Sequence, residues 1–169
     1  MVMPQIFARD WHRSLFNQDM AQVWSLMTPD FRRVVAQAAL GGNGRSADEL
    51  DPIVDELAVA APARSDLQQF YDVACSMLQV RCGISPDAVG AGMTTRVEAP
   101  SFEVVRLYVL EDLSIDMEGN HFLADGQTAR ALTLILSAED DATWSMAGIG
   151  GVLAPGWSPT LVWEPSAEV

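Results

Sequence analysis

The chain has 169 residues, of which 49% are hydrophobic, a net charge of −13 and no lysine. This length supports one domain with a single core that needs neither a metal ion nor a disulfide to hold it. An acidic surface repels phosphate groups, which disfavours nucleic acids and anionic membranes as partners. Without lysine, the chain lacks Schiff-base catalysis, covalent attachment of pyridoxal phosphate and a Walker-type phosphate loop.

The N-terminal segment carries Arg9 and Asp10 where a signal peptide would have an apolar centre, and no apolar stretch is long enough to span a membrane. We therefore expect a cytoplasmic protein. The only cysteines, Cys75 and Cys82, are seven residues apart on one predicted helix, a rise of roughly 10 Å that is too great for a disulfide. We expect both to be reduced, buried thiols. Two histidines are too few for a His-rich metal site, so we predict no metal and no cofactor.

Helical periodicity dominates the N-terminal half of the chain. The first predicted helix begins at Pro4, and a short second helix follows Asp19, which is a suitable cap. Thr28 and Pro29 give a stronger start signal for a third helix, which two glycines stop at 41–42.

Two further helices are predicted from capping-box matches. Ser46 and Glu49 form the first match, but Pro52 lies too deep for one uninterrupted helix, so the helix is expected to start at Asp51-Pro52 instead. Ser65 and Gln68 form the second match, and that helix is expected to run to about residue 81.

Three apolar runs in the C-terminal half are predicted strands, at 102–111, 129–139 and 143–150. Both faces of the first run are mostly apolar, so we expect this strand to be covered on both sides. A short acidic link at 139–142 favours a hairpin between the last two strands, and the glycines that follow favour a bulge. Residues 84–98 are expected to be loop-like. Residues 112–127 are an acidic connection with turn signals at 118–120 and 125–126; they suit a solvated hairpin connection better than a calcium loop.

Helices followed by strands predict an α+β fold, a curved and mostly antiparallel sheet with the N-terminal helices on its concave face. We expect a single domain with helices at about 4–82, the sheet at about 94–151 and a tail at 152–169. The proline-rich stretch in this tail is expected to turn and lay Trp157 and Trp163 on the domain or on a partner.

Several stretches together resemble the NTF2-like superfamily, whose cone-shaped fold is shared by SnoaL-like cyclases, ketosteroid isomerases and scytalone dehydratase. They are Ala8-x-x-Trp11, Leu15-Phe16-Asn17-Gln18-Asp19, Val23-Trp24-Ser25-Leu26-Met27-Thr28-Pro29-Asp30-Phe31-Arg32, Phe102-Glu103-Val104-Val105, and Trp144-Ser145-Met146-Ala147-Gly148-Ile149-Gly150 with Pro155-Gly156-Trp157-Ser158-Pro159. The resemblance implies an apolar pocket between the first helices and the sheet, and dimerisation through the outer face of the sheet. The superfamily contains both enzymes and non-catalytic members.

No catalytic dyad of these enzymes matches this chain residue by residue. The predicted helix at 50–60 is an addition to the minimal fold, where it could narrow or cap the pocket. His12 is a candidate general base on the first helix, although it could equally be a surface histidine paired with an acid. Arg106 and Tyr108 share one face of a strand. If that face lines the cone, Arg106 could hold an anionic group and Tyr108 could polarise a carbonyl.

The candidate ligand-binding residues are those expected around the cone, and the aromatic ones among them also suit a simple core. They are Trp11, Leu15, Trp24, Phe31, Tyr71, Arg106, Tyr108 and Trp144.

Two classes of function are compatible with these residues. The first is a non-catalytic module that dimerises through the sheet or binds a small apolar molecule in the cone. The second is a cofactor-free isomerase, dehydratase or cyclase that transfers a proton, which requires a buried ionisable group facing a cavity. The scarcity of acids and bases that point inward favours the first class. The acidic composition and the outward apolar face of the predicted strand favour a homodimer. A packed cone would end the enzyme hypothesis.

Overall fold

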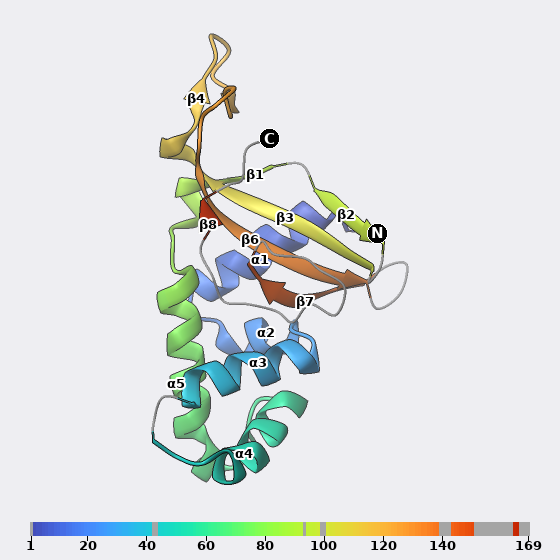
Figure 1. The fold of residues 1–169 in the computed structure, drawn as a ribbon, viewed down its shortest axis with the longest axis vertical. Helices are drawn as coiled ribbons and strands as arrows, with labels where there is room; N and C mark the ends of the chain where they lie inside the picture. The colour runs from blue at the N-terminus through green and yellow to red at the C-terminus, as the bar shows by residue number, and fades with distance from the viewer. Residues whose placement is uncertain are drawn as a thin grey trace.

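The structure is a computed structural model that describes residues 2–41, 44–92, 94–98, 101–138, 143–150 and 164–165. The predictions for the link at 139–142 and for Trp157 and Trp163 lie outside the described residues. The described part confirms the predicted α+β class: helices come first, and a curved antiparallel sheet follows (Figure 1). Among the helices of the described residues, none has the length and apolar character that crossing a membrane requires.

The first three helices begin where the sequence predicts. Helix α1 (Pro4–Phe16) starts at its proline, and α2 (Met20–Ser25) starts after Asp19, whose carboxylate accepts a hydrogen bond from the backbone N–H of Gln22. At the start of α3 (Pro29–Leu40), the hydroxyl of Thr28 accepts from the N–H of Phe31 at 3.2 Å. Each cap pairs a backbone donor that the helix itself leaves unpaired.

The prediction that the fourth helix starts at Asp51-Pro52 is wrong. Helix α4 (Ala47–Val59) begins at the capping box of Ser46 and Glu49 and continues through Pro52. A proline cannot donate to the carbonyl of Asp48, four residues earlier, but both residues are exposed, so water can reach that carbonyl. The second capping box is also wrong, because α5 (Ser65–Cys82) already includes Ser65 and has Arg64 at its N-cap with no side-chain bond.

Six described strands form one antiparallel sheet in which β3 (Ser101–Val109) and β6 (Arg130–Ala138) are central. Strand β7 (Trp144–Ile149) pairs with β6 on its far side, and β8 (Glu164–Pro165) extends that side. The prediction of a loop at 84–98 is wrong, because β1 (Val89–Ala91) and β2 (Thr95–Glu98) both pair with β3. They follow a short 3-10 helix, η1 (Pro86–Ala88).

The predicted bulge is present in the pairing of β6 with β7. Ile135 lies opposite Gly148 while the next residue, Leu136, lies opposite Met146, so Ala147 is the extra residue. The bulge bends the sheet, as a curved sheet requires. Strand β3 ends two residues earlier than predicted, where a 3-10 helix, η2 (Leu110–Asp112), begins.

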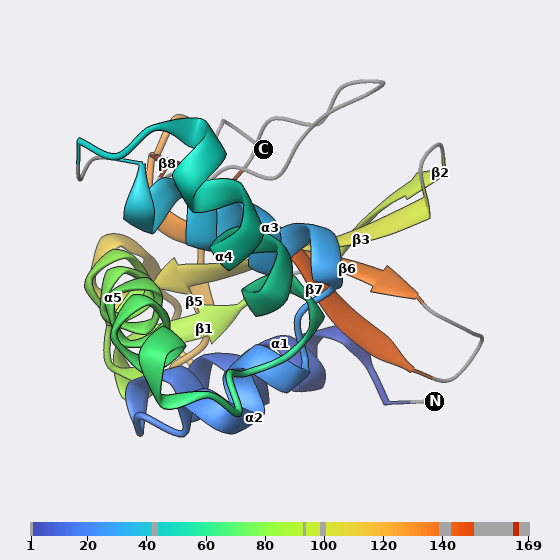
Figure 2. The ribbon, with the colours of Figure 1, turned by 90° about the horizontal axis from the view of Figure 1, so that it is seen from below.

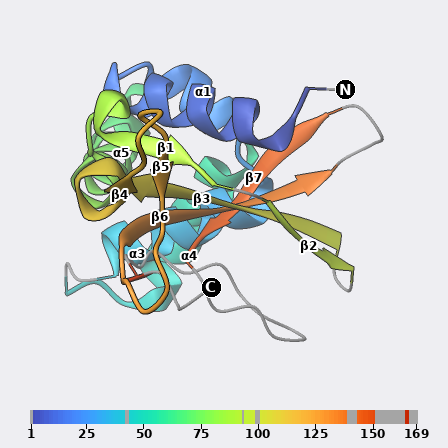
Figure 3. The same ribbon diagram turned by 90° about the horizontal axis from the view of Figure 1, so that it is seen from above.

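Helix α1 lies along one side of the sheet, and α3 and α4 pack together at one end of the molecule (Figures 1, 2 and 3). Alternate residues of the two central strands, among them Val105, Leu107, Leu132 and Leu134, join the buried cluster formed with the helices. The core therefore lies between α1, α3, α5 and this face of the sheet.

The opposite face of the sheet has no described helix in front of it (Figure 1). Its residues Val104, Ala131, Thr133 and Ile135 are nevertheless buried within the single chain. This burial confirms cover on both sides of β3 at Val104, whereas Arg106 and Tyr108 on the same face are half-buried. It also means that the exposed apolar face on which the homodimer prediction depended is not found at these four positions.

At the end of the molecule opposite α4, residues 113–128 project from the sheet (Figure 1). We call this segment the arm. It contains β4 (Ser114–Ile115) paired with β5 (His121–Phe122), so the predicted acidic connection is a short hairpin. The predicted turns occur at Gly119 and Gly126, which have φ values of 86° and 73°.

Candidate functional site

The interior between the helices and the sheet is occupied by the aromatic residues predicted to line a pocket. Trp11, Trp24 and Phe31 are completely or almost completely buried, and Leu15 packs with them in the same cluster. The rings of Trp24 and Tyr71 meet edge to face, with centroids 5.2 Å apart. This is a favourable arrangement for two aromatic rings.

Each polar group on these rings is already paired with a backbone carbonyl. The indole Nε1 of Trp11 donates to the oxygen of Val23 at 3.2 Å, and that of Trp24 donates to the oxygen of Leu57 at 3.0 Å. The hydroxyl of Tyr71 donates to the oxygen of Met20 at 3.0 Å. These bonds join α2 to α1, α4 and α5. The indole N–H groups and the hydroxyl therefore hold the helices together and do not face a ligand.

His12 lies in the same interior and is buried, so it is not the surface residue that the second sequence interpretation described. Its Nε2 is 3.1 Å from the backbone oxygen of Cys82, which can only accept, so Nε2 carries the proton. Burial lowers the pKa of His12, and hydrogen bonds with the backbone of Cys82 and Ile84 oppose this shift in part. The neutral ring ties α1 to the end of α5.

Trp144 lies at the start of β7, where its indole N–H donates to the backbone oxygen of Val2 at 2.9 Å. It is partly buried against the core. The same bond fixes the segment before α1 to the sheet.

Arg106 and Tyr108 lie on the other face of β3. Because Val105 and Leu107 point into the core, the two-residue period of the strand turns Arg106 and Tyr108 away from it. Across the sheet, Arg106 lies opposite Thr133 of β6. The ring of Tyr108 lies against Gly92, where an added Cβ would be only 2.5 Å from Cε2 of the ring. The core-facing positions of β3 are therefore occupied by aliphatic residues, and Arg106 and Tyr108 do not line the interior.

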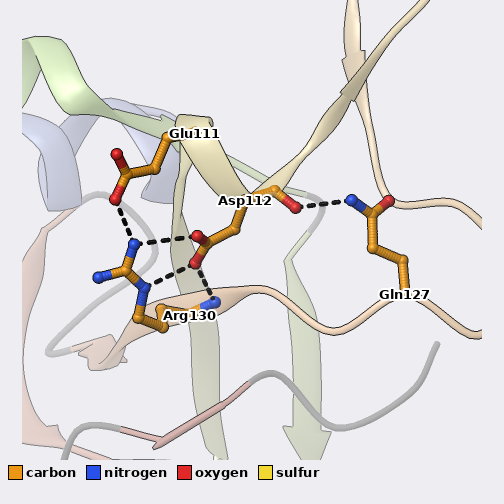
Figure 4. Close-up of polar contacts among 4 residues, drawn as sticks. All are labelled: Glu111, Asp112, Gln127 and Arg130. Carbon is orange, nitrogen blue, oxygen red and sulfur yellow. Dashed lines mark hydrogen bonds and ion pairs between the residues drawn. The ribbon is translucent and has the colours of Figure 1, made fainter.

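A dense set of polar contacts lies at the base of the arm (Figure 4). The guanidinium of Arg130 donates through Nε and Nη2 to both carboxylate oxygens of Asp112, at 2.8 and 2.9 Å, and also pairs with Glu111. The backbone N–H of Arg130 donates to the same carboxylate at 2.9 Å. These bonds hold the pKa of Asp112 at about 2, well below its usual range. We call Glu111, Asp112 and Arg130 the clamp.

Gln127 extends the clamp into the arm. Its amide nitrogen donates to the backbone oxygen of Asp112 at 2.7 Å, and its amide oxygen accepts from the N–H of Ala124 and the hydroxyl of Ser114. One side chain thus joins Ser114 of β4 and Ala124, which follows β5, to Asp112 of η2. The clamp is exposed, so its effect is to fix the direction of the arm more than to stabilise the whole fold.

The tip of the arm is closed by Asp116. One carboxylate oxygen accepts from the backbone N–H groups of Glu118 and Asn120, at 2.9 and 2.8 Å, and the other accepts from the side chain of Asn120. These bonds lower the pKa of Asp116. Both oxygens of the Asp116 carboxylate are thus engaged within the turn.

Cys75 and Cys82 are free and buried, as predicted. Burial raises the pKa of the Cys75 thiol to about 11 and that of Cys82 to about 12, so both stay protonated and unreactive at neutral pH. In the described part of the chain, no group of three or more His, Cys, Asp or Glu residues is arranged to hold a metal ion.

No protein-family model, curated protein or solved structure matches this chain.

Sequence reasoning predicted the hairpin of the arm from its turn signals but missed the clamp. Asp112 marked only the end of a strand, and Arg130 stands 18 residues later, so their pairing follows from the return of the chain along β6. The signal that could have indicated the clamp is the predicted hairpin itself, because its turns at 118–120 and 125–126 fold the chain back toward Asp112.

Proposed function

We propose that the chain is a non-catalytic interaction module of the NTF2-like type that acts through its surface. The observation that carries this proposal is the use of the interior polar groups. Four interior side chains each use a polar atom in a hydrogen bond to a backbone carbonyl of another segment. They are Trp11, His12, Trp24 and Tyr71. A residue so engaged cannot offer that atom to a substrate without breaking a buried hydrogen bond.

The alternative, a cofactor-free isomerase, dehydratase or cyclase, needs an acid or base in contact with the substrate. Of its three candidates, His12 is bonded within the core, while Arg106 and Tyr108 lie on the far face of β3. This placement supports the non-catalytic reading. A small apolar ligand in the cone would have to share the space that Trp11, Trp24 and Phe31 fill.

The surface also supports the proposal, because the arm presents apolar side chains to solvent on a fixed hairpin. The predicted homodimer needs an apolar sheet face that a second copy can reach. Since Val104 and Ile135 are buried in the single chain, these positions do not offer such a face.

Thermal unfolding in the presence of apolar carbonyl and hydroxyl compounds, such as steroid ketones and aromatic polyketides, tests the proposal. A ligand of the folded state at 100 times its Kd adds about 2.7 kcal/mol, or a rise of roughly 5–10 °C in Tm for a chain of this size. We expect shifts below about 1 °C across the panel. A compound that raises Tm by more than about 5 °C, and that loses this effect in Trp24→Leu, would overturn the proposal.

A further inference from the structure

Three large apolar side chains of the arm are exposed. Ile115 has 62% of its surface exposed, Phe122 has 45%, and Met117 is fully exposed. Exposed apolar residues scattered singly are ordinary, whereas these three lie close together in sequence on one short projecting hairpin.

These side chains surround the arm. Residues directly opposite each other in an antiparallel pair point to the same face. Ile115 pairs with His121, and Phe122 pairs with Ser114, so Ile115 and Phe122 lie on opposite faces, while Met117 lies at the turn. A hairpin with apolar groups on both faces and at its tip suits insertion between two walls, not attachment to a flat surface.

The arm is held in one shape before it meets any partner. The clamp and Gln127 fix its base, and Asp116 closes its tip through three hydrogen bonds. Such preorganisation removes much of the entropy cost that a mobile loop would pay on binding.

The charge of the arm decides what kind of partner suits it. Glu118 and Asp125 are exposed on the arm, and the chain as a whole has a net charge of −13 and no lysine. A second copy of the chain would bring the same negative charge, whereas a groove rimmed by arginine and lysine would attract the arm and speed association.

We propose that the arm inserts into an apolar groove, rimmed by basic residues, on a different protein. This inference rests on the proposed interaction function and adds the docking element and the chemistry of the partner. It requires that Ile115, Met117 and Phe122 carry affinity and that Glu118 and Asp125 carry the salt dependence of binding.

Site-specific photo-crosslinking in cells of the natural host tests the inference. The photoreactive amino acid p-benzoylphenylalanine replaces Met117 in the full chain, and in a control chain it replaces Val80, which is also exposed but lies on α5. We expect an adduct at position 117 and none with the same protein at position 80. The adduct is identified by mass spectrometry, and the captured protein is then purified and titrated with the unmodified chain.

In that titration, Ile115→Ser with Met117→Ser and Phe122→Ser should weaken binding by at least tenfold. Glu118→Gln with Asp125→Asn should reduce the slope of log Kd against log salt concentration. Circular dichroism checks that each variant is folded, which the exposure of all five positions favours.

The outcomes separate the two proposals. No adduct at 117, an acidic captured protein, a second copy of the chain, or a partner whose affinity ignores the triple variant would each overturn the inference about the arm. A partner captured at position 80 alone would overturn that inference and leave the interaction function standing. A small molecule that raises Tm through the interior would overturn the interaction function itself.

Discussion

The indole Nε1 of Trp24 donates a hydrogen bond to the backbone oxygen of Leu57 at 3.0 Å, in the buried space between α2 and α4. This bond makes α4 part of the core. Helix α4 also contributes Leu50 and Val54 to the buried cluster.

Replacing Trp24 with phenylalanine should leave the carbonyl of Leu57 buried without a donor. An unsatisfied buried polar group costs about 1–3 kcal/mol, and the smaller ring adds a cavity term to the loss in free energy of unfolding. Urea denaturation measures the change. Trp144→Phe is the matched control, because Val2 is exposed and water can replace the donor that its carbonyl loses. Equal losses in the two variants would contradict this role of Trp24.

The stability of the fold should fall as the pH decreases below about 6.5, the usual pKa of histidine in an unfolded chain. Burial lowers the pKa of His12 in the folded state, so the unfolded state takes up a proton first. Stability is therefore fully present above pH 6.5 and decreases below it. Melting temperatures between pH 8 and pH 5 check this. His12→Gln should flatten this part of the curve, whereas the same change at exposed His121 should leave it in place.

The clamp should govern the order of the arm without controlling global stability. Arg130→Gln removes the donors that Asp112 and Glu111 share, so amide hydrogen exchange at 113–128 should speed up several-fold while exchange in α1 stays the same. Arg64→Gln, which breaks another exposed ion pair at α5, is the control and should leave the arm unchanged. If exchange in the arm did not respond to Arg130→Gln, the arm would be rigid for another reason.

The pKa of Asp112 provides a second measurement of the clamp. Its carboxyl should titrate at about 2 in the folded chain, and Arg130→Gln should return the midpoint to about 4. Because this pKa is lowered on folding, the small contribution of the clamp to the free energy of unfolding is present above about pH 4. It is lost as the pH falls toward 2. NMR titration of the Asp112 side chain reports both midpoints.

Pro52→Ala should stabilise the protein, because it restores a donor for the carbonyl of Asp48 within α4. Proline in a helix interior costs up to about 3 kcal/mol, and the greater freedom of the unfolded chain offsets roughly 0.4–1 kcal/mol of the gain. We expect a net gain of about 1–2 kcal/mol in chemical denaturation. At Pro29, the first residue of α3, the same substitution should give no gain, since no donor is needed there. A loss at Pro52 would mean that its ring packs in a way that the exposure of the residue does not reveal.

The sequence predicted much of the fold because local signals suffice for it. The cap of Thr28 with Pro29 located α3, and apolar runs bounded by acidic residues or turns located β3 and β6 to within a few residues. Strands β1 and β2 were missed, since three- and four-residue strands in a glycine-rich stretch exist only through their pairing with β3.

The candidate site was harder to predict for two physical reasons. Both faces of β3 are mostly apolar, so periodicity alone could not show that Val105 faces the core and Arg106 does not. The polar atoms of Trp11, Trp24 and His12 bond to backbone carbonyls 12, 33 and 70 residues away. Every residue has a backbone carbonyl, so the residue types in the sequence do not show which carbonyl accepts these bonds.

The central claim is that the interior of the cone is a packed core and not a ligand site. Xenon binds to apolar cavities in protein crystals, so a crystal structure determined under xenon pressure tests this claim most directly. We predict no xenon atom in the space bounded by Trp11, Trp24 and Tyr71. A well-occupied xenon site there, or a bound molecule retained from the cell, would contradict the account and return the cone to the list of ligand-binding sites.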